Sequence, residues 1–201
     1  LAPLHNHVGP MFWEMAGNGQ NLLREPGSPW VLITLSTSPQ PGDMTIVKTA
    51  LKPLKSMDLR VLVTLAPDHD KSGLDRLPDN VFVTGYIPHS KVLTRCRLVI
   101  SHAGHGIVMK AMAHGIPMVL VPWGRDQPGV ASRAQRLGIA KVVPRDRCSV
   151  DALSAAIKEV MADQNYWLRS QVVASRLGEM DGVANGVRKI QSFLNQGDRF
   201  F

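Results

Sequence analysis

Residues Ser101–Gly106, with the sequence SHAGHG, decide the fold of this 201-residue chain. The preceding run Arg97–Ile100 is short and rich in β-branched residues, which predicts a buried parallel strand. The following residues, Ile107–His114, have a helical pattern of apolar positions that ends at Gly115 and Pro117. The quoted stretch is therefore expected to form a strand-to-helix turn at the carboxyl edge of a parallel sheet.

The chemistry of this turn favours a bound phosphate. Backbone N–H groups and the positive end of a helix attract an anion, and a glycine such as Gly104 lets that anion approach closely. His102 adds a side-chain donor. The next predicted strand, Met118–Val121, leads to Asp126 and Gln127 at the same edge. This layout is typical of a site for a phosphate-linked polar ligand, such as a nucleotide that carries a sugar.

Length and composition predict one globular domain, because 44% of the residues are hydrophobic and 19% are charged. The apolar runs are far shorter than the ~20 residues of a membrane helix. The start, Leu1–His5, has no charged region followed by an apolar stretch, so no signal peptide is expected. Cys96 and Cys148 are isolated and fit reduced thiols. We expect a cytoplasmic protein, and the lack of an initiator Met suggests a fragment of a longer chain.

The net charge of +7 permits an anionic ligand, so nucleic acid has to be considered as a partner. The basic residues are scattered, however, and the four Trp and two Tyr are not interleaved with them as a base-stacking platform. We therefore expect neither a nucleic-acid partner nor stable membrane insertion.

Predicted strands and helices alternate as far as about Val143, which is typical of parallel β-α-β units with helices on both faces of the sheet. The predicted fold is α/β and Rossmann-like, with residues 1–29 as a linker that lies against a single domain of residues 30–201. The expected strands are Trp30–Ser36, Arg60–Ala66, Asn80–Thr84, Arg97–Ile100 and Met118–Val121. The expected helices are Met44–Met57, Lys91–Thr94, Ile107–His114, Pro128–Leu137, Ser149–Met161, Gln164–Leu177 and Val183–Leu194.

Other interpretations of the glycine turn are weaker. Gly104 and Gly106 invite comparison with the dinucleotide fingerprint G-x-G-x-x-G, but the third position is Met109 and no acidic residue ends the following strand. The lysine loop of P-loop enzymes is absent. His102 and His105 lack further ligands at metal-binding spacing, so no metal and no cofactor are expected. His102 is either a phosphate donor or an edge histidine, and His105 is structural or a wall of the cleft.

Two further polar stretches also have a structural alternative. Asp126 is either the N-cap of the helix that begins at Pro128, or a ligand, or both. The carboxylate of Asp126 and the amide of Gln127 supply acceptors and donors for neighbouring sugar hydroxyls. Ser36 and Thr37 follow the first strand and offer hydroxyls and N–H groups to a phosphate, although an ordinary polar loop also explains them.

In order along the chain, these stretches resemble the motifs of the carboxyl-terminal, donor-binding half of GT-B glycosyltransferases. This family includes UDP-glucuronosyltransferases, plant flavonoid glycosyltransferases and bacterial macrolide glycosyltransferases. It carries a His-Gly-Trp motif ending in Glu, then Gly-Val/Ile-Pro, then a proline-rich turn ending in Asp/Glu-Gln. The corresponding stretches here are His102–Lys110, Gly115–Pro117 and Pro122–Gln127. Upstream, Gly85–His89 resembles the W-x-P-Q/H element, and Val8–Pro10 resembles the linker that leaves the amino-terminal half.

The resemblance implies a role for each matching residue. Tyr86 would stack on the nucleobase, and the backbone of Ile87 would bond its edge. His102, with the N–H groups that follow Gly104, would hold the diphosphate and stabilise the charge of the leaving group without a metal. The other implied donor-binding residues are Ser36 and Thr37 at the phosphate, Ala103 and Gly106 in the turn, Lys110 on the following helix, and Asp126 and Gln127 at the donor sugar.

Three residues depart from the family pattern. Ile107 replaces a Ser or Thr whose hydroxyl contacts phosphate, so that contact must come from the backbone. His105 replaces a Trp in the wall of the site. Lys110 replaces the Glu that bridges the ribose hydroxyls, and a cation cannot accept their hydrogen bonds. We expect Lys110 to turn to solvent or to reach toward phosphate, and a 2′-deoxy donor such as a dTDP-sugar to become more plausible than a UDP-sugar.

The resemblance thus implies the donor-binding domain of an inverting, metal-independent glycosyltransferase that transfers a hexose or deoxyhexose to a hydroxyl of a small hydrophobic acceptor. In this family the general base and acceptor pocket belong to the amino-terminal half, so we expect the chain alone to bind donor without efficient turnover. Two alternatives remain: a stand-alone module that pairs with a separate acceptor-side chain, and a sugar-nucleotide epimerase. Epimerase chemistry needs carboxylates near the sugar, and Asp126 alone supplies one. The sequence leaves donor nucleotide, sugar, acceptor and oligomeric state open.

Overall fold

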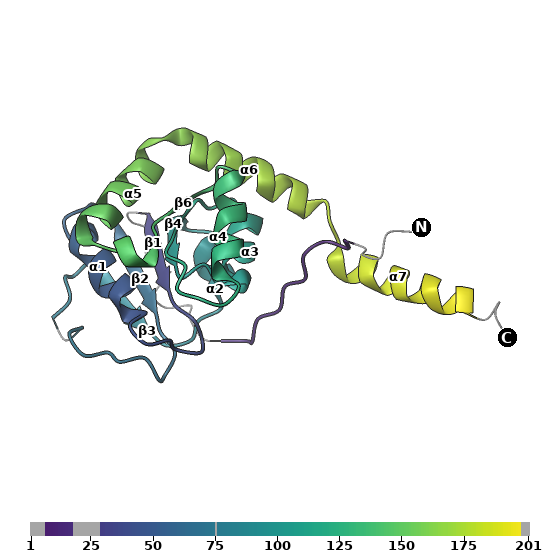
Figure 1. The fold of residues 1–201 in the computed structure, drawn as a ribbon, viewed down its shortest axis with the longest axis horizontal. Coiled ribbons are helices and arrows are strands. Elements are labelled where there is room, and N and C mark those ends of the chain that lie inside the picture. Colours follow the sequence, from purple (N-terminus) through teal and green to yellow (C-terminus); the bar gives the residue numbers. More distant parts are fainter. Residues whose placement is uncertain (1–6, 18–28, 75, 198–201) are drawn as a thin grey trace.

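The computed structural model describes residues 7–17, 29–74 and 76–197. Its centre is a parallel sheet of six strands in the order β3-β2-β1-β4-β5-β6 (Figure 1). The predicted α/β, Rossmann-like class is therefore confirmed. The strands are β1 (Trp30–Thr34), β2 (Arg60–Thr64), β3 (Val81–Thr84), β4 (Cys96–Ser101), β5 (Met118–Leu120) and β6 (Ala140–Val142).

Helices cover both faces of the sheet, and the side chains of β1 show which helix covers which face. Ile33 belongs to the same buried cluster as Ile46 of α1 and Ile157 of α5. Leu32, one position earlier and on the opposite face, clusters with Val108 of α3. The helices are α1 (Met44–Leu54), α2 (His89–Leu93), α3 (His105–Ala113), α4 (Gln127–Arg136), α5 (Val150–Ala162), α6 (Gln164–Gly178) and α7 (Gly182–Gly197).

Several element ends differ from the predicted ones for local reasons. α1 ends at Leu54 instead of Met57, with Lys55 as its C-cap. α3 begins at His105, two residues earlier than predicted, because Gly104 is the extended N-cap. β6 was not predicted as a separate strand, since it has only three residues.

The carboxyl-terminal helices leave the sheet. α6 packs against α3 and α5, and α7 then extends away from the body of the domain beside residues 8–10 (Figure 1). Asn185 of α7 donates a hydrogen bond from Nδ2 to the carbonyl of Val8, at 2.8 Å. Among the helices of the described residues, none has the length and apolar character needed to cross a membrane. The predicted linker, residues 1–29, lies outside the described residues at positions 1–6 and 18–28.

The strand order fixes where a ligand can bind. β1 and β4 lie side by side, yet the chain leaves them toward opposite edges of the sheet, to β2 and to β5. Such a switch point opens a crevice at the carboxyl ends of the strands, where α/β folds bind their ligands. The loop after β1 and the turn after β4 border this crevice, so Ser36 and His102 are brought together by topology.

Candidate functional site

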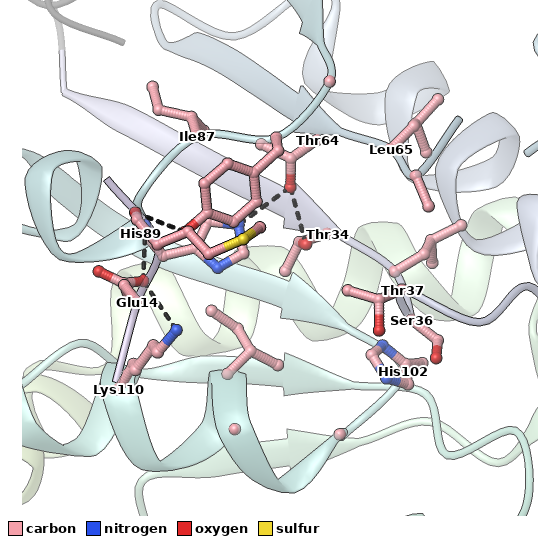
Figure 2. A pocket seen from close by; sticks show the side chains of 18 of the residues that line it. Glu14, Thr34, Ser36, Thr37, Thr64, Leu65, Ile87, His89, His102 and Lys110 are labelled. Atoms are coloured by element: carbon pink, nitrogen blue, oxygen red, sulfur yellow. Dashed lines mark hydrogen bonds and ion pairs between the residues drawn. The ribbon is translucent and has the colours of Figure 1, made fainter. Parts of the chain in front are cut away.

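A cavity of about 540 Å³ lies at this carboxyl edge, bordered by the ends of β1, β2, β3 and β4, the first turns of α3 and residues 14–15 (Figure 2). That volume is in the range of pockets that hold small molecules. Eight of the predicted site residues line it: Ser36, Thr37, Tyr86, Ile87, His102, Gly104, Gly106 and Lys110. Three others, Ala103, Asp126 and Gln127, are not among the lining residues.

His102 forms one end of the cavity, next to Ser36 and Thr37 (Figure 2). The side chain is buried, and burial lowers the pKa of its imidazole, while the backbone of Thr34 and the nearby carboxylates of Asp43 and Asp126 act to raise it. The free protein therefore holds a neutral imidazole at neutral pH. A buried neutral imidazole can donate one hydrogen bond to an anion and take up a proton when that anion binds.

Gly104 is required by the position of the imidazole. A Cβ at residue 104 would collide with Nε2 of His102, so any residue other than glycine would require the imidazole to shift. Gly104 is also the N-cap of α3, and the first intrahelical hydrogen bond runs from Val108 N–H to the carbonyl of Gly104, at 3.1 Å. The N–H groups of residues 105–107 consequently have no intrahelical partner. Imidazole and helix N-terminus together make this end suited to an anion.

The opposite end of the cavity is formed by Tyr86 and by polar side chains at its floor. The phenol of Tyr86 donates to the carbonyl of Met15, at 2.9 Å. Thr64 donates from Oγ1 to Thr34 Oγ1, at 2.7 Å, and lies 3.1 Å from Nε2 of His89. Burial and the nearby Lys110 lower the pKa of His89 to about 4, against an opposing effect of Glu14, so this histidine is neutral.

Lys110 does neither of the two things expected of it. Its ammonium lies 2.7 Å from Oε1 of Glu14, and both side chains are largely buried in the cavity wall (Figure 2). Glu14 also accepts hydrogen bonds from the N–H groups of His89, at 2.8 Å, and Ser90, at 3.1 Å. Burial opposes the charge, yet the hydrogen bonds from Lys110 and Ser90 lower the pKa of Glu14 to about 2. Sequence reasoning missed Glu14, which belongs to no motif and lies far from Lys110 along the chain.

The three remaining predicted residues have other surroundings. Gln127 is buried, and its Oε1 accepts hydrogen bonds from the N–H groups of Trp123, at 2.7 Å, and Gly124, at 3.0 Å. Asp126 is the N-cap residue of α4, as one of its two predicted roles has it, although its exposed carboxylate forms no capping hydrogen bond. Ala103 is buried with a φ of 65°, and it turns the chain from β4 into α3. The roles of Asp126 and Gln127 at a donor sugar and of Ala103 in the donor-binding turn stay predictions.

The fold is that of the carboxyl-terminal half of GT-B glycosyltransferases. The spinosyn rhamnosyltransferase SpnG, solved with spinosyn aglycone, superimposes with a TM-score of 0.84 at 20% sequence identity, over 94% of this chain and 53% of that chain. The same enzyme has been solved with thymidine diphosphate and matches with a TM-score of 0.77. These likenesses establish the fold.

The family follows from sequence. Residues 48–180 match the model of the family described as "Erythromycin biosynthesis protein CIII-like, C-terminal domain", and the chain belongs to this family. NDP-glycosyltransferase YjiC of Bacillus subtilis is 26% identical over 94% of this chain and 48% of its own length. O-mycaminosyltylonolide 6-deoxyallosyltransferase of Streptomyces fradiae is 31% identical over 90% of this chain and 42% of its own length. The chain thus spans about half the length of the curated relatives that it matches.

Proposed function

We propose that this chain is the nucleotide-sugar-binding domain of an inverting, metal-independent glycosyltransferase that acts on a hydroxyl of a small acceptor. The observation that carries the proposal is that one cavity has His102 and the N-terminus of α3 at one end and Tyr86 and Ile87 at the other. One end suits a diphosphate and the other suits a nucleobase. The N–H groups at one end of the cavity and the aromatic ring at the other are complementary to the diphosphate and the base of a nucleoside diphosphate.

At the phosphate end, the proposed role of the protein is electrostatic. The acceptor hydroxyl attacks the anomeric carbon, the bond from that carbon to the phosphate oxygen breaks, and the nucleoside diphosphate leaves with the electron pair. Negative charge then grows on the oxygen that faces His102 and the N–H groups after Gly104. Prearranged donors at such a position stabilise a transition state strongly. The hydroxyl proton goes to a base of the amino-terminal half.

The donor sugar and nucleotide are proposed from the relatives. One curated relative is named for the transfer of a 6-deoxy sugar, and a solved relative of the same fold holds thymidine diphosphate. Both support a dTDP-linked deoxyhexose as the donor, with a UDP-sugar as the alternative. Asp126, exposed beside the cavity end that holds His102, supplies a carboxylate for the hydroxyls of that sugar.

The proposal is tested by titration calorimetry of the 201-residue chain with dTDP and with UDP, each with Mg²⁺ and with EDTA. Both nucleotides are expected to bind, and chelation is expected to leave the affinity unchanged. His102→Ala should weaken binding by about 1–3 kcal/mol, as for loss of a charge-assisted hydrogen bond.

The matched control is His105→Ala. His105 is exposed and lines a smaller pocket with Met109, so its removal should change affinity by no more than about twofold. No heat with either nucleotide would exclude the donor-domain proposal. Binding that vanishes with EDTA would exclude only its metal-independent mechanism, and equal effects of the two histidine variants would show that the diphosphate lies elsewhere.

A further inference from the structure

The carboxylate of Glu14 joins the N-terminal segment to two helices of the domain. Its Oε1 accepts from the ammonium of Lys110 on α3 and from the N–H of His89, and its Oε2 accepts from the N–H of Ser90. His89 and Ser90 begin α2, where backbone N–H groups have no intrahelical partner. Glu14 therefore caps α2 from outside that helix and neutralises Lys110 with the same carboxylate.

The residues that follow Glu14, as far as Gly17, extend this contact along the rim of the cavity. The carbonyl of Met15 accepts from Tyr86, and the carbonyl of Gly17 accepts from the ammonium of Lys91, at 3.3 Å. A Cβ at Gly17 would lie 2.9 Å from Cδ of Pro88, so the backbone here touches the loop before α2 directly. Glu14 and Met15 thus line one side of the cavity, Gly17 continues the contact to α2, and the carbonyl of Met15 fixes the hydroxyl of the aromatic ring expected to face the base.

The side chains before Glu14 contribute little to this attachment. Trp13 is 78% exposed and Phe12 is 46% exposed, so most of the Trp13 surface and nearly half of the Phe12 surface are in solvent. The attachment of residues 14–17 accordingly depends on polar contacts, of which those of Glu14 are the most numerous and the most buried. Among the described residues that line the cavity, Glu14 is the acidic one.

We propose that Glu14 is a positioning residue that latches residues 14–17 onto the nucleotide cavity, so that docking of this segment and nucleotide binding reinforce each other. The proposal rests on the proposed function for the identity of the ligand. Coupling of this kind is reciprocal: if the docked segment completes the site, bound nucleotide must stabilise docking by the same factor. Because residues 14–17 come before β1, the contacts of Glu14 also fix the direction from which residues 7–13 approach the domain.

The test is amide hydrogen exchange on the 201-residue chain, first without nucleotide. In Glu14→Ala, the amides of His89 and Ser90 lose their hydrogen-bond acceptor and should exchange about tenfold faster. A factor of this size is ordinary for the coupling between two contacting parts of a protein. Glu14→Gln keeps an acceptor oxygen without the charge and should fall between wild type and Ala. The control is Glu159→Gln, which breaks an exposed ion pair with Lys141 at 2.8 Å, away from the cavity. It should leave these amides unchanged.

The second measurement is nucleotide affinity of the same variants. Glu14→Ala should bind dTDP about tenfold more weakly, and dTDP should slow exchange at His89 and Ser90 in the wild type more than in the variant. Equal exchange at these amides in wild type and Glu14→Ala would overturn the latch. Faster exchange with unchanged dTDP affinity would overturn the coupling and leave the proposed function standing. Failure of the wild type to bind nucleotide would overturn the proposed function, while the exchange without nucleotide still decides the latch.

Discussion

The two ends of the cavity are built in different ways. The end with His102 is built around consecutive residues: β4 ends at Ser101, the imidazole follows, Gly104 makes room for it, and α3 begins at His105, with Ser36 and Thr37 of the loop after β1 beside them. The end with Tyr86 is made by residues distant in sequence, since Glu14 meets Lys110 across most of the domain. The first end is a local motif, and the second is a set of long-range polar contacts.

This difference determines how each end responds to substitution. At the phosphate end the constraint is steric, because a Cβ at residue 104 would occupy the space of the His102 ring and the imidazole would have to shift. At the base end the constraint is electrostatic, because a lysine in the wall of the cavity is stabilised by a carboxylate that arrives from another segment. A buried charge that loses its partner is costly, so the two residues at positions 14 and 110 must be considered together.

The largest effect is expected from Gly104→Ala. The backbone at residue 104 has φ −60° and ψ 138°, which alanine adopts without strain, so the substitution changes only the space beside His102. The new Cβ collides with the imidazole and displaces it, as in an overpacked core. Affinity for dTDP should fall by about 1–3 kcal/mol, at least as far as in His102→Ala. Titration calorimetry measures this directly.

Gly178→Ala is the matched control, because a Cβ there meets no atom within 4 Å at the end of α6. It should leave dTDP affinity unchanged. If Gly104→Ala binds as well as the wild type, the imidazole does not need the position that it has here, and the contrast between a steric and an electrostatic end fails.

The turn at the phosphate end could be predicted from the sequence because the residues that form it lie within a few positions of one another. The β-branched run before His102 specifies the strand, and the glycines specify the turn, so the neighbourhood of imidazole and helix N-terminus follows from local rules. The sheet was equally accessible: the predicted strands share their central residues with the observed ones and differ by one or two residues at their ends.

Tyr86 and Ile87 at the base end were predicted from the resemblance, but two other features of the site could not be predicted, each for a physical reason. The pairing of Glu14 with Lys110 depends on where the N-terminal segment lies, and an extended segment has no periodicity that shows its direction. Gln127 illustrates the second reason. A polar residue in a loop satisfies either a ligand or the loop's own backbone, and only the loop conformation shows that its oxygen is used by Trp123 and Gly124.

An intermediate effect is expected at Lys110, in the balance between ribose and deoxyribose. Lys110→Glu alone places a second carboxylate against Glu14, so binding of every nucleotide should weaken. Combined with Glu14→Gln, the new carboxylate has no like charge beside it and can accept from the ribose hydroxyls. The double variant should then favour UDP over 2′-deoxy-UDP by about 0.5–1.5 kcal/mol more than wild type does, the value of one hydrogen bond.

UDP and 2′-deoxy-UDP differ only in the 2′-hydroxyl, so their ratio reports on the ribose and is free of any effect of the base. Glu14→Gln alone serves as the control and should leave the ratio as in wild type, because residue 110 is still a lysine. An unchanged ratio of UDP to 2′-deoxy-UDP affinity in the double variant would mean that residue 110 does not face the ribose. The contacts of the base end would then be limited to the nucleobase.

The smallest effect is a pH dependence at the phosphate end. Burial lowers the pKa of free His102 below its ordinary 6.5, with Asp43, Asp126 and His69 also facing it, whereas a bound diphosphate favours the charged imidazole and raises that pKa. Binding therefore takes up a proton, and affinity should increase as the pH falls from 8 to 6, by at most about tenfold per pH unit. dTDP-glucose is the suitable ligand, because it lacks the terminal phosphate group that titrates near pH 6. His102→Gln should bind more weakly and with a flatter pH profile. A profile of equal slope in both proteins would assign the proton to another group and leave His102 as a neutral donor.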